Sequence, residues 1–197
     1  LNKFIPVAAG MAGGSSDAAA ALVGMNKLFR LGMSKEELMK VGVKIGADVP
    51  YCIMRGTALS EGIGEKLTAL PSLPACYILI GKPGVSVSTK FVYTNLKLDE
   101  KTKHPDIDGM LDALQRQDLY GITDRMENVL ESVTVPAYPV IQEIKDHMKA
   151  HGALNVFGIF DDKKKAEFAC EKLKESGLTR QTFLTTAFNH GGTPDDK

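Results

Sequence analysis

A stretch of glycine, small and hydroxyl residues near the start of the 197-residue chain has the composition of a phosphate-binding loop. It reads Gly10-Met11-Ala12-Gly13-Gly14-Ser15-Ser16 and runs directly into a predicted helix from Asp17 to Phe29. Glycines let the backbone approach an anion, hydroxyls donate hydrogen bonds, and the positive end of the helix faces the same point. The pattern predicts a site for nucleotide phosphates; a glycine-rich turn before a close-packed helix is the alternative.

The loop differs from two familiar nucleotide motifs. No lysine follows the glycines as in GxxxxGK[ST], and no GxGxxG opens the helix. Ser15 and Ser16 are interpreted as donors to phosphate oxygens or to a magnesium-bound water, with simple N-capping of the helix as the alternative.

A second candidate for chemistry is Asp48, in the short turn Gly46-Ala47-Asp48-Val49-Pro50 between a predicted helix and a predicted strand. A carboxylate there is able to accept the proton of an attacking hydroxyl, or to orient that hydroxyl toward a phosphate. The alternative is a helix-capping or turn-forming aspartate. Asp17, the competing carboxylate, is expected to stabilise the helix dipole.

The composition excludes several classes of protein. Lys and Arg total 24 against 24 Asp and Glu, so no net charge favours nucleic acid or an anionic membrane. No apolar run approaches the roughly 18 residues of a membrane span. Three scattered cysteines without a CxxC pair argue against disulfides and zinc and predict buried thiols in a reducing, cytoplasmic setting. The four histidines show no ligand spacing, and Lys163 to Lys165 is interpreted as a solvated helix start.

The elements that must position these residues predict two domains. Before the linker Pro71 to Pro74 we expect two helices, one from Asp17 to Phe29 and one that begins at a capping box of Ser34 and Glu37. A hairpin of residues 50–54 with residues 57–60 and a strand at residues 66–70 are expected to follow. After it we expect strands at 76–80, 156–160 and 182–188, and helices at 89–96, 107–114, 124–133, 140–149 and 163–176. The second half therefore reads as an α+β domain around an antiparallel sheet. The predicted domains are 1–72 and 73–190, with a mobile tail at 191–197.

The run from Pro6 to Ala20 resembles the phosphate-binding motif of the GHMP kinases. Further stretches extend the resemblance over nearly the whole chain: Gly46-Ala47-Asp48-Val49-Pro50, Gly56-Thr57-Ala58-Leu59, Gly62-Ile63-Gly64-Glu65-Lys66, Val87-Ser88-Thr89 and Asn128-Val129-Leu130-Glu131. The resemblance implies the two-domain GHMP kinase fold, with an incomplete N-terminal nucleotide domain and a ferredoxin-like C-terminal domain.

The resemblance also implies a reaction and its residues. The reaction is ATP-dependent phosphorylation of the 2-hydroxyl of a cytidine-diphospho-methylerythritol, with ATP and magnesium as cofactors and no side chain assigned as a metal ligand. Asp48 takes the family's catalytic position and also contacts substrate, with Thr89 and Tyr93 on the substrate side. The residues expected at ATP are Pro6, Ala8, Gly10, Ala12, Gly13, Gly14, Ser15 and Ser16.

Tyr93 is expected to stack on the cytosine ring, with an ordinary half-buried helix tyrosine as the alternative. The protein is expected to be a monomer or homodimer. Alternatives to this function are another GHMP kinase acting on a different small alcohol, a non-catalytic nucleotide-binding module and, last, a structural domain.

The chain departs from the family pattern at two places. GHMP kinases of this kind carry an Ala-Lys-Ile-Asn-Leu-like run near their start and a Ser-Gly-Ser-Gly-Pro-like motif before the strand at Val156; neither is present here. We expect that Asn155 and Val156 are not neighbours in the full polypeptide and that a lysine-bearing segment precedes Leu1.

Overall fold

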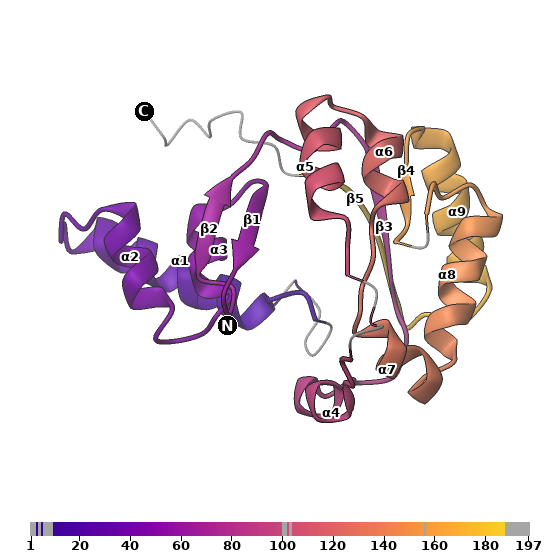
Figure 1. The fold of residues 1–197 in the computed structure, drawn as a ribbon, viewed down its shortest axis with the longest axis horizontal. Helices are drawn as coiled ribbons and strands as arrows, with labels where there is room; N and C mark the ends of the chain where they lie inside the picture. Colours follow the sequence, from indigo (N-terminus) through magenta and orange to yellow (C-terminus); the bar gives the residue numbers. More distant parts are fainter. Residues whose placement is uncertain are drawn as a thin grey trace. The chain divides into compact units, whose positions relative to one another are not determined.

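The computed structural model describes residues 3, 5, 10–99, 102, 104–155 and 157–187. The chain divides into two compact units between Ser72 and Leu73. Because the placement of one unit against the other is not determined, each is described by itself (Figure 1). No helix in the described part of the chain has the length and apolar character needed to cross a bilayer.

The first unit contains three helices and a hairpin: α1 Gly13–Leu28, α2 Lys35–Gly42, α3 Val49–Met54, β1 Ala58–Glu61 and β2 Lys66–Ala69. The predicted capping box of α2 is confirmed: the Glu37 amide donates to Ser34 Oγ at 3.2 Å and the Ser34 amide donates to Glu37 Oε2 at 2.8 Å. The three helices enclose a core of Ala19, Leu38, Val49 and Ile53. Strands β1 and β2 pair antiparallel, with Glu61 opposite Lys66.

The predicted hairpin between Pro50–54 and 57–60 is wrong. Residues 49–54 form helix α3, and the partner of β1 is β2. Val49 and Ile53 lie one helical turn apart and are both buried, and proline at the second helical position costs no hydrogen bond. A short apolar run fits either a strand or a buried helix, and here packing against α1 and α2 selected the helix.

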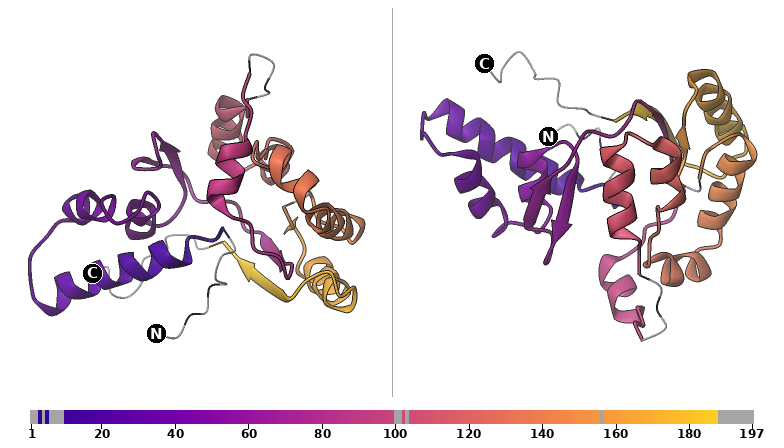
Figure 2. Two further views of the ribbon diagram at one scale, coloured as in Figure 1. Left: turned by 90° about the horizontal axis from the view of Figure 1, so that it is seen from below. Right: turned by 45° about the horizontal axis from the view of Figure 1, so that its top comes forward.

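The second unit is built on a three-stranded antiparallel sheet in the order β4-β3-β5: β4 Ile159–Phe160, β3 Tyr77–Lys82 and β5 Gln181–Thr186. Its helices are α4 Thr89–Asn95, α5 Ile107–Gln115, α6 Leu119–Asp124, α7 Glu131–Ala137, α8 Val140–Ala150 and α9 Lys163–Glu175. Helices cover both faces of the sheet (Figure 2). Leu79 and Phe160 pack with α8 and α9 on one face, while Ile78 and Ile159 pack with α6 on the other. This split follows from the alternation of side chains along a strand.

The helix predicted from Asp124 to Val133 is also wrong, because α6 ends at Asp124 and α7 begins at Glu131. Asp118 caps α6 by accepting from the Gly121 amide at 2.9 Å. At the other end the Arg125 guanidinium donates to the Gly121 carbonyl at 2.8 Å. The two contacts make α6 a separate short helix. The mixed helix-and-sheet composition predicted for this half is confirmed, and Lys163 to Lys165 form an exposed helix start, as predicted.

Some expectations fall outside the described residues. They concern the extended segment 1–7 apart from residues 3 and 5, the Asn155–Val156 junction, and the tail 191–197.

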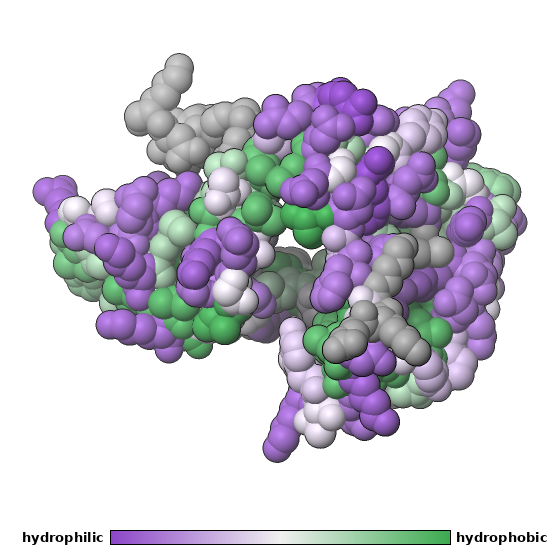
Figure 3. Space-filling view, viewed as in Figure 1, coloured by the Kyte–Doolittle hydropathy of each residue, from purple (hydrophilic) through white to green (hydrophobic). Residues whose placement is uncertain are grey.

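On the first unit, apolar side chains are exposed at the C-terminal end of α1 and just after it, namely Met25, Leu28, Phe29 and Leu31. Apolar surface is accordingly visible at the α1–α2 end of this unit (Figure 3).

Candidate active site

The first turn of α1 presents backbone amides that have no hydrogen-bond partner among the residues that the structure describes. Its N-cap is Ala12, in a left-handed conformation (φ 49°, ψ 28°), and Gly10 before it also has a positive φ of 67°. The first hydrogen bond of the helix runs from the Ser16 amide to the Ala12 carbonyl at 2.8 Å. The amides of Gly13, Gly14 and Ser15 therefore precede the helical ladder, at the positive end of a 16-residue helix. This arrangement suits an anion such as phosphate.

The helix begins four residues earlier than predicted, so Gly13 to Ser16 are its first turn and not a loop before it. Neither Ser15 nor Ser16 occupies the N-cap position, and the interpretation of these serines as simple N-caps is wrong. Asp17 also lies beyond the first turn, and its carboxylate pairs with Lys3 Nζ at 2.8 Å. Asp17 is therefore not placed to stabilise the helix dipole from the first turn, and its carboxylate forms an ion pair instead.

Asp48 stands at the N-cap position of α3, but its exposed side chain accepts no capping hydrogen bond. Its backbone is fixed instead: the Val49 amide donates to the Gly46 carbonyl at 3.1 Å and the Cys52 amide donates to the Asp48 carbonyl at 3.1 Å. Burial, and then the Asp48 carboxylate, raise the pKa of the half-buried Cys52 thiol. The capping alternative is thus not realised by the side chain, and the carboxylate keeps its acceptor oxygens for other partners.

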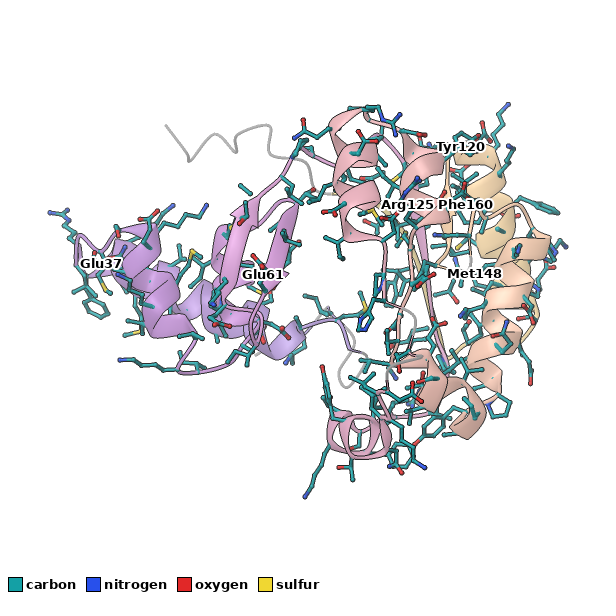
Figure 4. All side chains as sticks on the ribbon, viewed as in Figure 1. Glu37, Glu61, Tyr120, Arg125, Met148 and Phe160 are labelled. Atoms are coloured by element: carbon teal, nitrogen blue, oxygen red, sulfur yellow. The ribbon has the colours of Figure 1, made fainter. Side chains whose placement is uncertain are left out.

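The turn containing Asp48 lies beside the first turn of α1. A β-carbon built on Gly46 would be 3.9 Å from Ser15 Oγ and 3.6 Å from Val49 Cγ2. Helices α1 and α3 pack directly on one another. Figure 4 draws the side chains of this unit and labels Glu37 and Glu61 on it. The structure therefore places the turn that carries Asp48 next to the first turn of α1, so the two segments that the sequence marks as candidates for chemistry are neighbours in the fold.

Thr89 and Tyr93 belong to the second unit, on α4. The sequence offers Ser88 or Thr89 as the cap of this helix, and the structure selects Ser88, whose Oγ accepts from the Phe91 amide at 3.4 Å. Thr89 and Tyr93 lie one turn apart on an exposed face, and Tyr93 is 62% exposed, so the half-buried alternative for this tyrosine is wrong. Pro6 and Ala8 lie outside the described residues.

Sequence analysis missed a pocket of about 450 Å³ in the second unit. It is lined by Phe157, by residues 126–129 and by the start of α7, including Glu131. Glu131 there forms an ion pair with the buried Lys145 of α8. In the sequence, the Asn128 to Glu131 stretch carries only a family resemblance and predicts no role for these residues.

Within the described ranges, no three His, Cys, Asp or Glu side chains gather into a group that could hold a metal ion. Magnesium commonly keeps several waters and binds through substrate phosphates with one or two carboxylates. The hydroxyls of Ser15 and Ser16 and the carboxylate of Asp48 fit that mode, since it requires no dedicated cage of side chains.

Comparison with known proteins defines the class first. The family described as the GHMP kinases N terminal domain matches residues 1–56, which include the first turn of α1 and Asp48. In fold, the chain is similar to a homoserine kinase from Cytophaga hutchinsonii, with a TM-score of 0.74 and 18% identity over 95% of this chain and 68% of that one. At this identity the similarity concerns the fold alone.

More specific similarity comes from curated relatives. The chain is 60% identical over 197 residues to the 4-diphosphocytidyl-2-C-methyl-D-erythritol kinase of Lachnoclostridium phytofermentans, covering 95% of this chain and 68% of the relative. It is 58% identical over 198 residues to the enzyme of the same name from Lachnospira eligens, with the same coverage. A crystal structure of 4-(cytidine 5'-diphospho)-2C-methyl-D-erythritol kinase matches with a TM-score of 0.73 and 28% identity, over 94% of this chain and 68% of that one. The chain belongs to the 4-diphosphocytidyl-2-C-methyl-D-erythritol kinase family.

Proposed function

We propose that the chain transfers the γ-phosphoryl group of ATP to the 2-hydroxyl of 4-diphosphocytidyl-2-C-methyl-D-erythritol, a step of the non-mevalonate route to isoprenoids. Membership of the kinase family supports the activity and the use of ATP. The observation that supports the residue roles is the exposed, uncapped Asp48 side chain on a turn that contacts the first turn of α1, where the amides of Gly13 to Ser15 precede the helical ladder.

In this proposal the phosphates of ATP lie against the amides of Gly13, Gly14 and Ser15, with the hydroxyls of Ser15 and Ser16 as further donors. Gly10 and Ala12 shape the approach through their positive φ angles, and Pro6 and Ala8 complete the segment. Magnesium neutralises phosphate charge when bound. The acceptor oxygen forms a bond to the γ-phosphorus as the bond to the β-phosphate oxygen breaks, ADP leaves, and the hydroxyl proton passes to Asp48.

The finer assignments are part of the same proposal. Residues 1–72 are a partial ATP-binding domain of the GHMP type, and residues 73–190 are a ferredoxin-like C-terminal domain that carries Thr89 and Tyr93 for the cytidine. The helix-covered antiparallel sheet of the second unit supports the ferredoxin-like assignment. The protein acts in the cytoplasm as a monomer or homodimer.

The test is ATP consumption by the intact protein with 4-diphosphocytidyl-2-C-methyl-D-erythritol, beside mevalonate, homoserine and galactose. Turnover is expected with the cytidine compound alone. Asp48→Asn is expected to lower kcat by about 100-fold or more while ATP affinity stays nearly constant, because it removes the proton acceptor without adding bulk. Near-normal kcat in this variant would show that Asp48 is structural.

A further inference from the structure

The turn between β1 and β2 is held by three hydrogen bonds within the hairpin. It consists of Gly62-Ile63-Gly64-Glu65, and its Glu65 carboxylate accepts from the Ile63 amide at 2.8 Å. The Ser60 hydroxyl donates to the Gly64 carbonyl at 3.1 Å, and the Gly64 amide donates to the Glu61 carbonyl at 3.1 Å. Hydrogen bonds from the Glu65 and Ile63 amides lower the pKa of Glu65, so this carboxylate is ionised at neutral pH. The turn therefore holds one fixed shape.

This fixed turn rests against the peptide that carries Asp48. A β-carbon built on Gly64 would lie 3.5 Å from the carbonyl oxygen of Ala47 and 3.9 Å from its carbonyl carbon. That carbonyl belongs to the same peptide unit as the Asp48 amide. Gly64 also has a φ of 117°, which side-chain-bearing residues rarely adopt, so the backbone conformation of the turn at this contact depends on glycine.

The same short segment also meets α1, since a β-carbon on Gly46 would lie 3.9 Å from Ser15 Oγ. Gly46 therefore contacts the first turn of α1, and Ala47 contacts the hairpin turn. The Asp48 side chain makes no capping hydrogen bond to α3. The place of its carboxylate therefore depends on the backbone of residues 46–48, which the hairpin turn contacts at Ala47.

We propose that Glu65 is a positioning residue for the reaction: it locks the hairpin turn, and through the contact of Gly64 with Ala47 the turn sets the place of the Asp48 carboxylate. This inference deepens the proposed function and rests on the role given there to Asp48. A displacement of about 1 Å in a reacting group is able to lower the rate on the order of 100-fold. The hydrogen bond of Glu65 is therefore expected to affect the rate measurably, although Glu65 itself does not contact the substrate.

The experiment compares Glu65→Ala with Glu61→Ala, a matched control on the same hairpin whose side chain faces Lys66 across the strands. Glu65→Ala is expected to lower kcat roughly tenfold or more with KM for ATP within about twofold. Glu65→Gln keeps an acceptor oxygen and is expected to retain most of kcat. Glu61→Ala is expected to match the parent protein.

A double variant separates positioning from general damage. If Glu65 acts through Asp48, adding Glu65→Ala to Asp48→Asn lowers kcat by no more than about threefold further, because the two residues work as a unit. Multiplication of the two single effects would overturn the proposal. Ser60→Ala, which removes a second tie of the turn, is expected to act in the same direction and serves if Glu65→Ala does not fold.

Amide hydrogen exchange gives a readout that needs no activity. The Val49 amide, which closes the 46–49 turn, is expected to exchange roughly tenfold faster in Glu65→Ala and at the parent rate in Glu61→Ala. Unchanged Val49 exchange would overturn the positioning role. Faster exchange together with full activity of Asp48→Asn would instead contradict the proposed function while leaving the mechanical tie in place.

Discussion

Gly14 offers the sharpest test of the phosphate site, because no described residue packs against it. A β-carbon built on Gly14 meets no atom of the described residues within 4 Å, whereas one on Gly13 would lie 3.1 Å from Ile5 Cγ2. Gly14→Ala therefore adds a methyl group without disturbing packing. Gly24, also in α1 and also with open space around its β-carbon, provides a matched control.

The effects on stability and on binding are expected to have opposite signs. Alanine is favoured over glycine in an exposed helix by about 0.5–1 kcal/mol, so Gly24→Ala is expected to raise the unfolding free energy by that amount. For a chain of this size, 1 kcal/mol corresponds to roughly 2–4 °C in Tm. Gly14→Ala is expected to give a similar or smaller gain, because it lies in the first turn.

Binding is expected to separate the two variants. The β-carbon of a helical residue tilts toward the helix N-terminus, so a methyl at Gly14 enters the space over the amides of Gly13 to Ser15. ATP affinity is expected to fall at least about tenfold in Gly14→Ala, or about 1.4 kcal/mol, and to stay constant in Gly24→Ala. Equilibrium ATP titration and thermal melting of both variants are the two measurements. A Gly14→Ala protein that is more stable and binds ATP with unchanged Kd would refute the placement of phosphate at this helix end.

Three further outcomes are expected. Tyr93→Ala weakens the cytidine substrate by about 1–3 kcal/mol and leaves ATP affinity unchanged, because a single base stacks there; equal losses for both ligands in a titration would contradict this. Arg55 has φ 63° and ψ 178°, a glycine-type conformation that costs other residues about 1–3 kcal/mol, so Arg55→Gly is expected to raise the unfolding free energy measured in urea. Burial, and then the neighbouring His151 ring, lower the pKa of His147 in the folded state. Its stabilising contribution is therefore complete above the unfolded pKa of about 6.5 and is lost as pH falls toward the folded value, and His147→Gln is expected to flatten that part of the stability profile.

Features set by neighbouring residues were predictable from the sequence. The capping box at Ser34 and Glu37 and the Ser88 cap of α4 depend on contacts three residues apart. The apolar run from Cys76 to Ile80 likewise predicted the strand β3. Residues 49–54, by contrast, are a short apolar run whose state depends on the surface they meet, and that information lies in α1 and α2.

The candidate site shows the same division. Glycine and serine spacing indicated an anion site, but the sequence did not reveal that the ladder of α1 starts at Ala12, because tertiary contacts overcame the low helix propensity of two glycines. Whether Asp48 caps its helix also depends on side-chain orientation. Glu65 carried no chemical signal of its own, since its effect depends on the approach of Gly64 to Ala47.

The strand order of the second unit has a consequence for how the protein is made. Strand β3 lies at the centre of the sheet, yet Ile78 pairs with Ile159 and Leu79 with Leu184, both far downstream. At ribosomal rates, β3 waits roughly 5–20 s for its partners after it has been synthesised. During that interval an apolar strand has neither edge covered, which is the condition that favours association between chains. The helices and hairpin of the first unit are stabilised by contacts between residues that are close in the sequence, so they do not wait for later parts of the chain. The yield of folded protein at elevated growth temperature is therefore expected to depend on how quickly β5 pairs with β3.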